Sequence, residues 1–170
     1  MEKYVLEALF QMNEPAFALE RMKQRYAKMM DYPEYTTLFE GWGIGPDGFG
    51  GGTINHAWSG GPLTLLSQKV CGIEPTSPGF RSFKVCPQMG TLTEASATVD
   101  THFGKIEVSL KRKGKKIQAT LSVPEGTTAE VICPDGSRKN FDPGRHQAKH
   151  VGLKEKNSTF VSFFLLLFCG

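Results

Sequence analysis

The stretch from Gly72 to Gly79, GIEPTSPG, separates two parts of the chain that differ in hydrophobic periodicity. It contains two prolines and two glycines, the residues that most often interrupt regular structure. Before this stretch apolar residues recur at helical spacing, and after it they alternate with polar ones. We therefore predict a linker or domain boundary here, with helices before it and strands after it.

The N-terminal part is predicted to contain helices. Residues 3–12, and a second segment that ends at Tyr32-Pro33, each place apolar residues on one helical face. These apolar positions are Val5, Leu6, Leu9, Phe10, Leu19, Met22, Tyr26 and Met29. Between them, Asn13-Glu14-Pro15 can end one helix and begin the next, since Asn caps helices and Pro suits a first turn. An αα-hairpin is therefore expected.

A third helix is expected to open between Ser59 and Pro62. Leu63, Leu66 and Val70 then lie on one face of it. Gly72 follows directly and suits the position after a helix end, where a left-handed backbone is common.

The C-terminal part alternates apolar and polar residues, as half-buried strands do. The alternating segments are 81–85, 95–99, 105–111, 117–123 and 128–132, with one or two more between 141 and 149. Turn residues separate them, and short strands at this spacing are typical of an antiparallel sandwich. The chain is therefore predicted to be α+β, with helices in residues 1–72 and a β-sandwich in residues 73–150.

The last residues, 151–170, follow neither pattern. Phe160 to Cys169 are almost entirely apolar, but ten residues are too few for a membrane-spanning helix, which needs about 20. A late strand and an interaction patch both fit this run. We favour a non-native tail that is not part of the fold, because an exposed apolar run of this size promotes aggregation.

Composition narrows the class of protein. The net charge of +3 over 170 residues is too small to indicate nucleic-acid binding. The four cysteines form no CxxC pair and no Cys/His cluster with zinc spacing, so no metal site and no cofactor are expected. The N-terminus, MEKYVLEALFQMNEP, has acidic residues and no continuous apolar run, so it is not a signal peptide. The cellular compartment stays open.

Residues 36–62, TTLFEGWGIGPDGFGGGTINHAWSGGP, contain the candidate site. They hold Glu40, His56 and both tryptophans of the chain, Trp42 and Trp58, and nine of the 19 glycines lie between Gly41 and Gly61. Indole rings can stack on the apolar face of a sugar, while a carboxylate and an imidazole bond its hydroxyls. This predicts a sugar-binding loop. The alternative is a structural loop in which Trp and His are satisfied core residues.

Five sequence motifs of this chain resemble those of a known protein family. They are EYTTLFEGW, TINHAWSGGPL, CGIEPTSPGFRSFKVCPQMG, VDTHFGKIEVSLKR and VPEGTTAEVICPDG. In this order and spacing they resemble the C-terminal part of bacterial α-L-rhamnosidases, which are inverting glycoside hydrolases of family 78. The resemblance extends from about Tyr4 to about Lys149. It implies that residues 1–72 are the last helices and active-site loop of an (α/α)6 barrel, and that residues 73–150 are a C-terminal β-sandwich.

The resemblance also implies roles for individual residues. Glu40 matches the family's general base, in a motif where Phe39 stands in place of a frequent Trp. His56 matches a sugar-binding histidine, and Trp42, Trp58 and Asn55 are expected to contact the sugar with it. The substrate implied is a carbohydrate with terminal α-L-rhamnose.

The family's general acid belongs to barrel segments upstream of Met1. The chain is therefore expected to be a C-terminal fragment whose missing partner is the rest of the barrel, and its activity alone stays uncertain. A non-catalytic module, either structural or carbohydrate-binding, is the alternative. In that case the helices merely pack on the sandwich.

Overall fold

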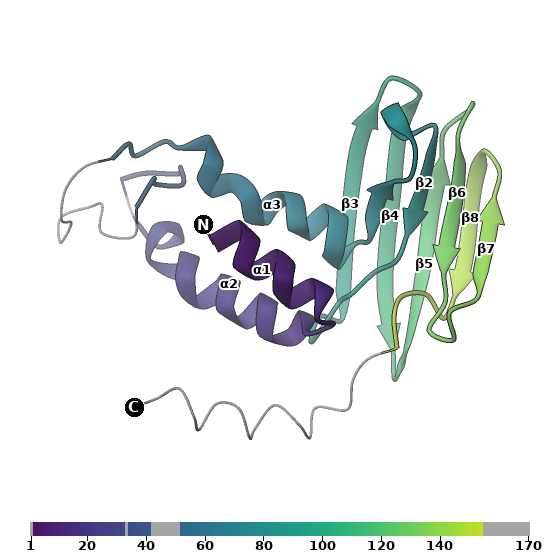
Figure 1. Ribbon diagram of the computed structural model, residues 1–170, viewed down its shortest axis with the longest axis horizontal. Helices are drawn as coiled ribbons and strands as arrows, with labels where there is room; N and C mark the ends of the chain where they lie inside the picture. Colours follow the sequence, from purple (N-terminus) through teal and green to yellow (C-terminus); the bar gives the residue numbers. More distant parts are fainter. Residues whose placement is uncertain (1, 33, 42–51, 155–170) are drawn as a thin grey trace.

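The computed structural model describes residues 2–32, 34–41 and 52–154. Figure 1 shows a helical part at one end of the molecule and two β-sheets at the other. All the α-helices precede Cys71 and all the strands follow it, with one short 3₁₀ turn, η3 (Pro78–Phe80), between the first two strands. The predicted α+β class, with helices first and a β-sandwich second, is confirmed.

Two α-helices form the expected hairpin. They are α1 (Glu2–Gln11) and α2 (Pro15–Met30), and they lie side by side in Figure 1. Asn13 adopts a left-handed backbone (φ 57°), and Pro15 begins α2. Leu6, Phe10 and Ala18 are fully buried between the helices and the segment that follows.

The third helix differs in detail from its prediction. A 3₁₀ turn (Ala57–Gly60) leads into α3 (Gly61–Leu65), which continues as a π-turn, η2 (Leu66–Val70). Leu65 and Val70 are buried, whereas Leu63 is 64% exposed, so the predicted apolar face was wrong. The π-turn is the reason, because it has a wider repeat and brings residues five apart onto the same side.

Eight strands form two four-stranded sheets. The first has the order β1 (Ile73–Pro75), β2 (Ser82–Val85), β6 (Thr128–Ile132), β7 (Arg138–Phe141). The second has the order β3 (Glu94–Thr101), β4 (Gly104–Lys113), β5 (Lys116–Val123), β8 (Gly144–Lys149). Every pairing is antiparallel except β2 with β6, which is parallel. That pair departs from the predicted antiparallel pattern because its strands are joined through the other sheet, and long crossovers permit parallel pairing.

The core of the sandwich is built by alternation along the strands. Buried and less buried residues alternate in β4 and β5, as a period of two requires. The largest buried side chains of the core are Phe83, Ile73, Met89, Ile106, Leu110 and Leu121. Burial of this apolar surface, at roughly 25 cal/mol per Å², is the main favourable term for the sandwich.

The predicted linker is part of the first sheet. Ile73 of β1 is buried and pairs with Val85 of β2. Gly72 adopts the left-handed backbone (φ 77°) expected after a helix, and a Cβ atom there would lie 2.3 Å from the carbonyl carbon of Cys86. The segment 72–79 therefore joins the two parts by packing as well as by covalent connection, and Pro78 and Gly79 lie in the short 3₁₀ turn that follows β1.

A partly buried ion-pair cluster joins the helical part to the first sheet. Glu74 of β1 accepts hydrogen bonds from Lys69 of the π-turn (2.7 Å) and from Lys84 of β2 (3.0 Å). Burial alone would raise the pKa of Glu74, but the hydrogen bonds and charges of the two lysines outweigh it and lower that pKa below its ordinary value.

The boundary predicted at residue 150 is too early. The Val151 side chain is buried in the sandwich core, and its N–H donates to the carbonyl of Ile117 (3.2 Å). Gly152 N–H likewise donates to the carbonyl of Ile132 (2.8 Å). Residues 155–170, with the apolar run Phe160–Cys169, lie outside the described residues. In the described part of the chain, no helix is long and apolar enough to cross a membrane.

We predict that Glu74→Gln lowers the free energy of unfolding by about 1–3 kcal/mol near pH 7, because hydrogen bonds to charged groups are lost. The pKa of Glu74 is lower in the folded state, so its contribution is complete above the unfolded pKa of about 4.3 and is lost as pH falls through the folded value. The free energies of unfolding of the wild type and of Glu74→Gln, measured with denaturant, should therefore become equal at low pH.

Glu94→Gln is the matched control, because the Glu94–Lys111 pair lies on the surface with both side chains exposed. Exposed pairs contribute about 0–1 kcal/mol. Equal effects of the two substitutions, or a difference that persists at low pH, would contradict the role assigned to Glu74.

Candidate functional site

Two segments without helix or strand, 37–41 and 52–56, meet at the end of the helical part. Glu40 N–H donates to the carbonyl of Thr53 (3.0 Å), and His56 N–H donates to the carbonyl of Leu38 (2.9 Å). The Thr37 hydroxyl also donates to the carbonyl of Ile54. These bonds hold the two segments together, so that Glu40 of the first lies close to His56 of the second.

Phe39 fixes the first segment to the helices. Its side chain is 2% exposed and packs with Tyr26 and Met29 of α2. Its ring also meets the rings of Tyr32 and Tyr35 edge to face, with centroids 5.6 and 5.8 Å apart. Phe39 is buried against the helices, whereas the side chain of its neighbour Glu40 is 46% exposed.

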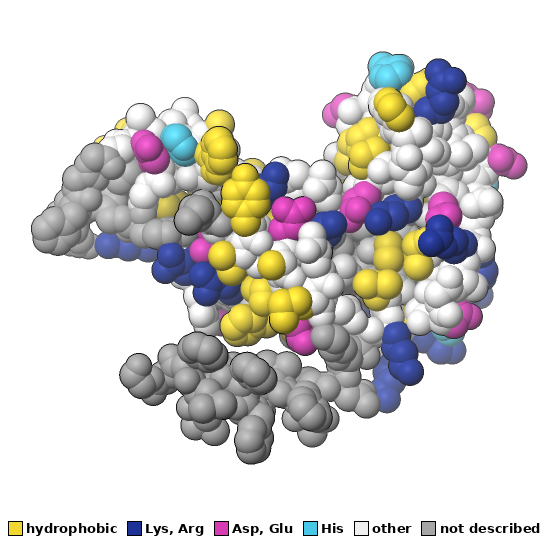
Figure 2. All heavy atoms as spheres, viewed as in Figure 1, with side chains coloured by type: hydrophobic (Ala, Val, Ile, Leu, Met, Phe, Trp, Pro, Cys, Tyr) yellow, Lys and Arg dark blue, Asp and Glu magenta, His cyan; other side chains and the backbone are white. Residues whose placement is uncertain are grey.

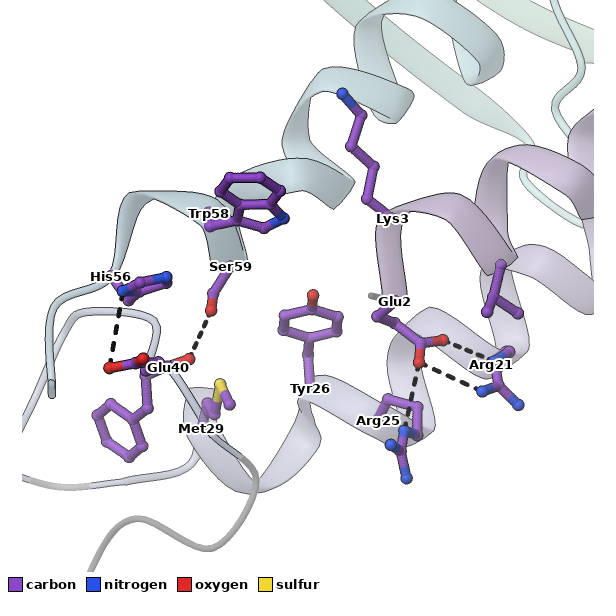
Figure 3. Close-up of a pocket in the computed structure, with 12 residues that line it drawn as sticks. Glu2, Lys3, Arg21, Arg25, Tyr26, Met29, Glu40, His56, Trp58 and Ser59 are labelled. Carbon is purple, nitrogen blue, oxygen red and sulfur yellow. Dashed lines mark hydrogen bonds and ion pairs between the residues drawn. The ribbon is translucent and has the colours of Figure 1, made fainter. Parts of the chain in front are cut away.

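Glu40 and His56 form the centre of the site. His56 Nδ1 lies 3.9 Å from Glu40 Oε2, and the two side chains are 36% and 46% exposed. Figure 3 shows the imidazole and the carboxylate facing each other. Glu40 Oε2 also accepts a hydrogen bond from Thr53 N–H (2.9 Å). The carboxylate is therefore held in position while it stays accessible from outside.

A cavity of about 390 Å³ lies between this pair and the first two helices, within the range of about 300–1,000 Å³ found for small-molecule sites. Trp58 lies at its margin and is 65% exposed, and Ser59 donates to the carbonyl of Phe39 (2.6 Å). In Figure 2 an acidic and a histidine side chain lie next to each other, close to hydrophobic side chains, at the end of the molecule away from the sandwich.

The opposite wall of the cavity is charged. Glu2 accepts two hydrogen bonds from Arg21 (2.6 and 3.2 Å) and lies 3.6 Å from Arg25, and its side chain is only 8% exposed. Both oxygens of Glu2 are thus engaged in an ion pair. The Tyr26 hydroxyl points into the cavity, between Glu2 on one side and Glu40 on the other (Figure 3).

Tyr26 brings a protonated hydroxyl group to the wall of the cavity. Burial, and then the negative charge of Glu2, raise its pKa above the ordinary value despite the nearby positive charge of Arg25. The phenol therefore keeps its proton at neutral pH.

The structure brings together some of the predicted site residues. Glu40, His56 and Trp58 line one cavity, and neither His56 nor Trp58 is a buried core residue. Asn55 is exposed and does not line it. Trp42 lies outside the described residues. Among the residues that the structure does describe, no group of three or more His, Cys, Asp or Glu side chains could hold a metal ion.

Sequence reasoning missed Tyr26 and Thr53. Tyr26 was assigned to the apolar stripe of the second helix, because helical spacing cannot distinguish a core ring from one whose hydroxyl faces a cavity. Nothing in the sequence indicates a role for Thr53, since its hydrogen bonds to Glu40 form only where two separate segments meet in the fold.

The family model of the bacterial alpha-L-rhamnosidase C-terminal domain matches residues 72–148. A curated alpha-L-rhamnosidase from Formosa agariphila is 30% identical over 112 residues, which is 62% of this chain and 12% of that protein. One from Streptomyces avermitilis is 33% identical over 106 residues, which is 58% of this chain and 10% of that protein. The chain thus spans a small fraction of the length of these relatives.

Solved structures of α-L-rhamnosidases are similar to this chain as well. The Streptomyces avermitilis alpha-L-rhamnosidase complexed with L-rhamnose has a TM-score of 0.70 at 26% identity, over 85% of this chain and 17% of that chain. The enzyme from Dictyoglumus thermophilum has a TM-score of 0.67 at 17% identity, over 89% of this chain and 20% of that chain, which shows the fold alone. The predicted resemblance to the C-terminal part of bacterial α-L-rhamnosidases is confirmed.

We predict that Phe39→Ala loosens the site without affecting the sandwich. Truncation of a buried Phe costs about 3–5 kcal/mol, and here the lost packing belongs to the segment that carries Glu40. Hydrogen exchange at the amides of Glu40 and His56 should therefore accelerate, while strands β4 and β5 keep their protection.

Tyr35→Ala is the control for this prediction, because Tyr35 contacts the same ring but is 37% exposed. Its effect on exchange should be smaller. Unchanged exchange at Glu40 and His56 in Phe39→Ala would show that Phe39 does not position the segment.

Proposed function

Because this chain is similar to the C-terminal part of bacterial α-L-rhamnosidases, we propose that Glu40, His56 and the adjoining cavity belong to the active site of an α-L-rhamnosidase. The substrate class is a glycoside or polysaccharide with terminal α-L-rhamnose. One observation supports this most: a carboxylate and an imidazole from two segments meet at a cavity that also has an exposed indole at its margin.

In this proposal Glu40 is the general base of an inverting hydrolysis. Its carboxylate accepts a proton from a water molecule, whose oxygen attacks the anomeric carbon on the face opposite the leaving group. The glycosidic C–O bond breaks, and a general acid gives a proton to the leaving oxygen. The two carboxyl groups of such a site are about 6.5–9.5 Å apart.

The general acid is proposed to come from barrel segments outside this chain. In the part of the chain that the structure describes, the other carboxylate lining the cavity is Glu2. Both of its oxygens accept hydrogen bonds from Arg21, so it is not presented to a leaving group. The small share of the relatives' length that the chain spans supports the same assignment.

The other site residues are proposed to bind the sugar. His56 would bond a hydroxyl group, and the exposed face of Trp58 suits stacking on the ring. Trp42 and Asn55 remain proposed contacts on the sequence resemblance alone.

A carbohydrate-binding function of the sandwich is the alternative. The outer face of the second sheet has a depression lined by Ser96, Thr98, Ser109, Thr120 and their neighbours. None of its lining residues is aromatic, so it lacks a ring for stacking on a sugar. The site formed by Glu40 and His56 is therefore preferred.

We predict that Glu40→Gln, in a longer rhamnosidase that carries this chain, lowers kcat by about 10²–10⁴-fold, since the amide cannot accept the proton. Glu130→Gln on the sandwich is the control, because that carboxylate only pairs with Arg138. His56→Ala should chiefly raise KM. Release of an aryl alcohol from an aryl α-L-rhamnoside measures all three, and near-normal turnover by Glu40→Gln would exclude Glu40 as the base.

For the chain by itself we predict no measurable hydrolysis of the same aryl rhamnoside, because no described group is suited to act as the acid. Turnover by the purified chain, abolished by Glu40→Gln, would contradict the assignment of the acid to other segments.

A further inference from the structure

The backbone of Thr53 both donates a hydrogen bond to Glu40 and accepts one from it. The Thr53 N–H donates to Glu40 Oε2 (2.9 Å), and the Thr53 carbonyl accepts from the Glu40 N–H (3.0 Å). One residue of the second segment therefore fixes both the backbone and one carboxylate oxygen of the proposed base.

The Thr53 hydroxyl lies between the two titratable groups of the site. Its Oγ1 atom is 3.5 Å from Glu40 Oε2 and 3.4 Å from His56 Nδ1. Both distances exceed the usual 2.5–3.0 Å or so of strong hydroxyl bonds, but hydrogen bonds of catalytic groups are often long until a ligand binds. The three groups form one chain of contacts.

The chemistry of these groups decides the direction of the bonds. An ionised carboxylate only accepts, so the Thr53 hydroxyl donates to Glu40 and is left to accept from His56. A lone pair on Nδ1 would face Glu40 Oε2 at 3.9 Å and be repelled, whereas a proton there is attracted by the carboxylate.

We propose that Thr53 is a positioning residue that holds Glu40 Oε2 and stabilises neutral His56 as the tautomer protonated at Nδ1. The Nε2 atom of His56 is then a hydrogen-bond acceptor. In Figure 3 this second ring nitrogen lies on the side of Trp58 and Ser59. The tautomer of His56 and the contacts of Thr53 do not depend on any catalytic activity. Only the identity of the ligand, a sugar, rests on the proposed function.

The arrangement has a consequence for the ligand. Within the described part of the chain Glu40 Oε1 accepts no hydrogen bond, so this oxygen remains for the proton of water. Nε2 requires a donor, which a free sugar hydroxyl supplies and an O-methyl ether cannot. The site therefore selects a rhamnose whose hydroxyl facing His56 is unsubstituted.

The tautomer can be measured in the full chain without any activity. Long-range ¹H–¹⁵N correlation spectra of ¹⁵N-histidine-labelled protein distinguish a protonated from an unprotonated ring nitrogen. At about pH 8.5, well above the titration of an ordinary imidazole, we expect His56 to carry its proton on Nδ1. A protonated Nε2 in the wild-type chain would overturn the proposal.

Three variants test the role of Thr53 in this tautomer. Thr53→Val keeps the shape but loses the hydroxyl, and should convert the Nδ1–H signal into a mixture of tautomers. Thr53→Ser restores the hydroxyl and the wild-type signal. Thr101→Val removes a hydroxyl on the sandwich that donates to the carbonyl of Gly104, and should leave His56 unchanged. If Thr53→Val keeps the wild-type tautomer, or fails to fold while Thr53→Ser loses it, Thr53 does not position His56.

A kinetic arm uses a longer rhamnosidase that carries this chain. Thr53→Val should lower kcat/KM by roughly three- to tenfold, as the loss of one hydrogen bond does, while Thr53→Ser and Thr101→Val stay near the wild type. A wild-type enzyme without rhamnosidase activity would refute the proposed function and leave the NMR result to decide on Thr53. Activity with unchanged kcat/KM in Thr53→Val would refute the positioning role alone.

Discussion

The burial of Phe39 against the second helix is the contact on which the site depends. It fixes the segment 37–41 to the helical part, and that segment forms the hydrogen bonds that position the segment 52–56. Glu40 stays exposed while its neighbour is buried. A short segment without regular secondary structure is thereby fixed to the helices, as the role proposed for Glu40 requires.

The helical part depends in turn on its connection to the sandwich. The two large apolar clusters share Leu92 and Ala95 as partly buried neighbours, so the helices pack on the start of β3. The ion pairs of Glu74 with Lys69 and Lys84 lie at the same junction. The sandwich therefore supports the last helix, α3, which runs away from it in Figure 1. The 3₁₀ turn that precedes α3 holds Trp58, and His56 comes directly before that turn.

The sequence predicted the order of helices and strands because each element has a clear period, as in β4 and β5. It could not predict β1, since three residues are too few to show a period and Pro75 suggests a turn. Glu40 and His56 were predicted as site residues from the chemistry of their side chains and from a motif. Thr53 was not, because its function comes from hydrogen bonds between segments that only the fold brings together.

The central claim is that Glu40 and His56 face one bound sugar. The most direct measurement is a crystal structure of a longer rhamnosidase carrying this chain, with L-rhamnose bound. The account predicts that the sugar occupies the cavity beside Trp58, with a hydroxyl within hydrogen-bond distance of His56 Nε2 and Glu40 Oε1 close to the anomeric carbon. A rhamnose bound elsewhere, with the pair of Glu40 and His56 facing empty solvent, would contradict it.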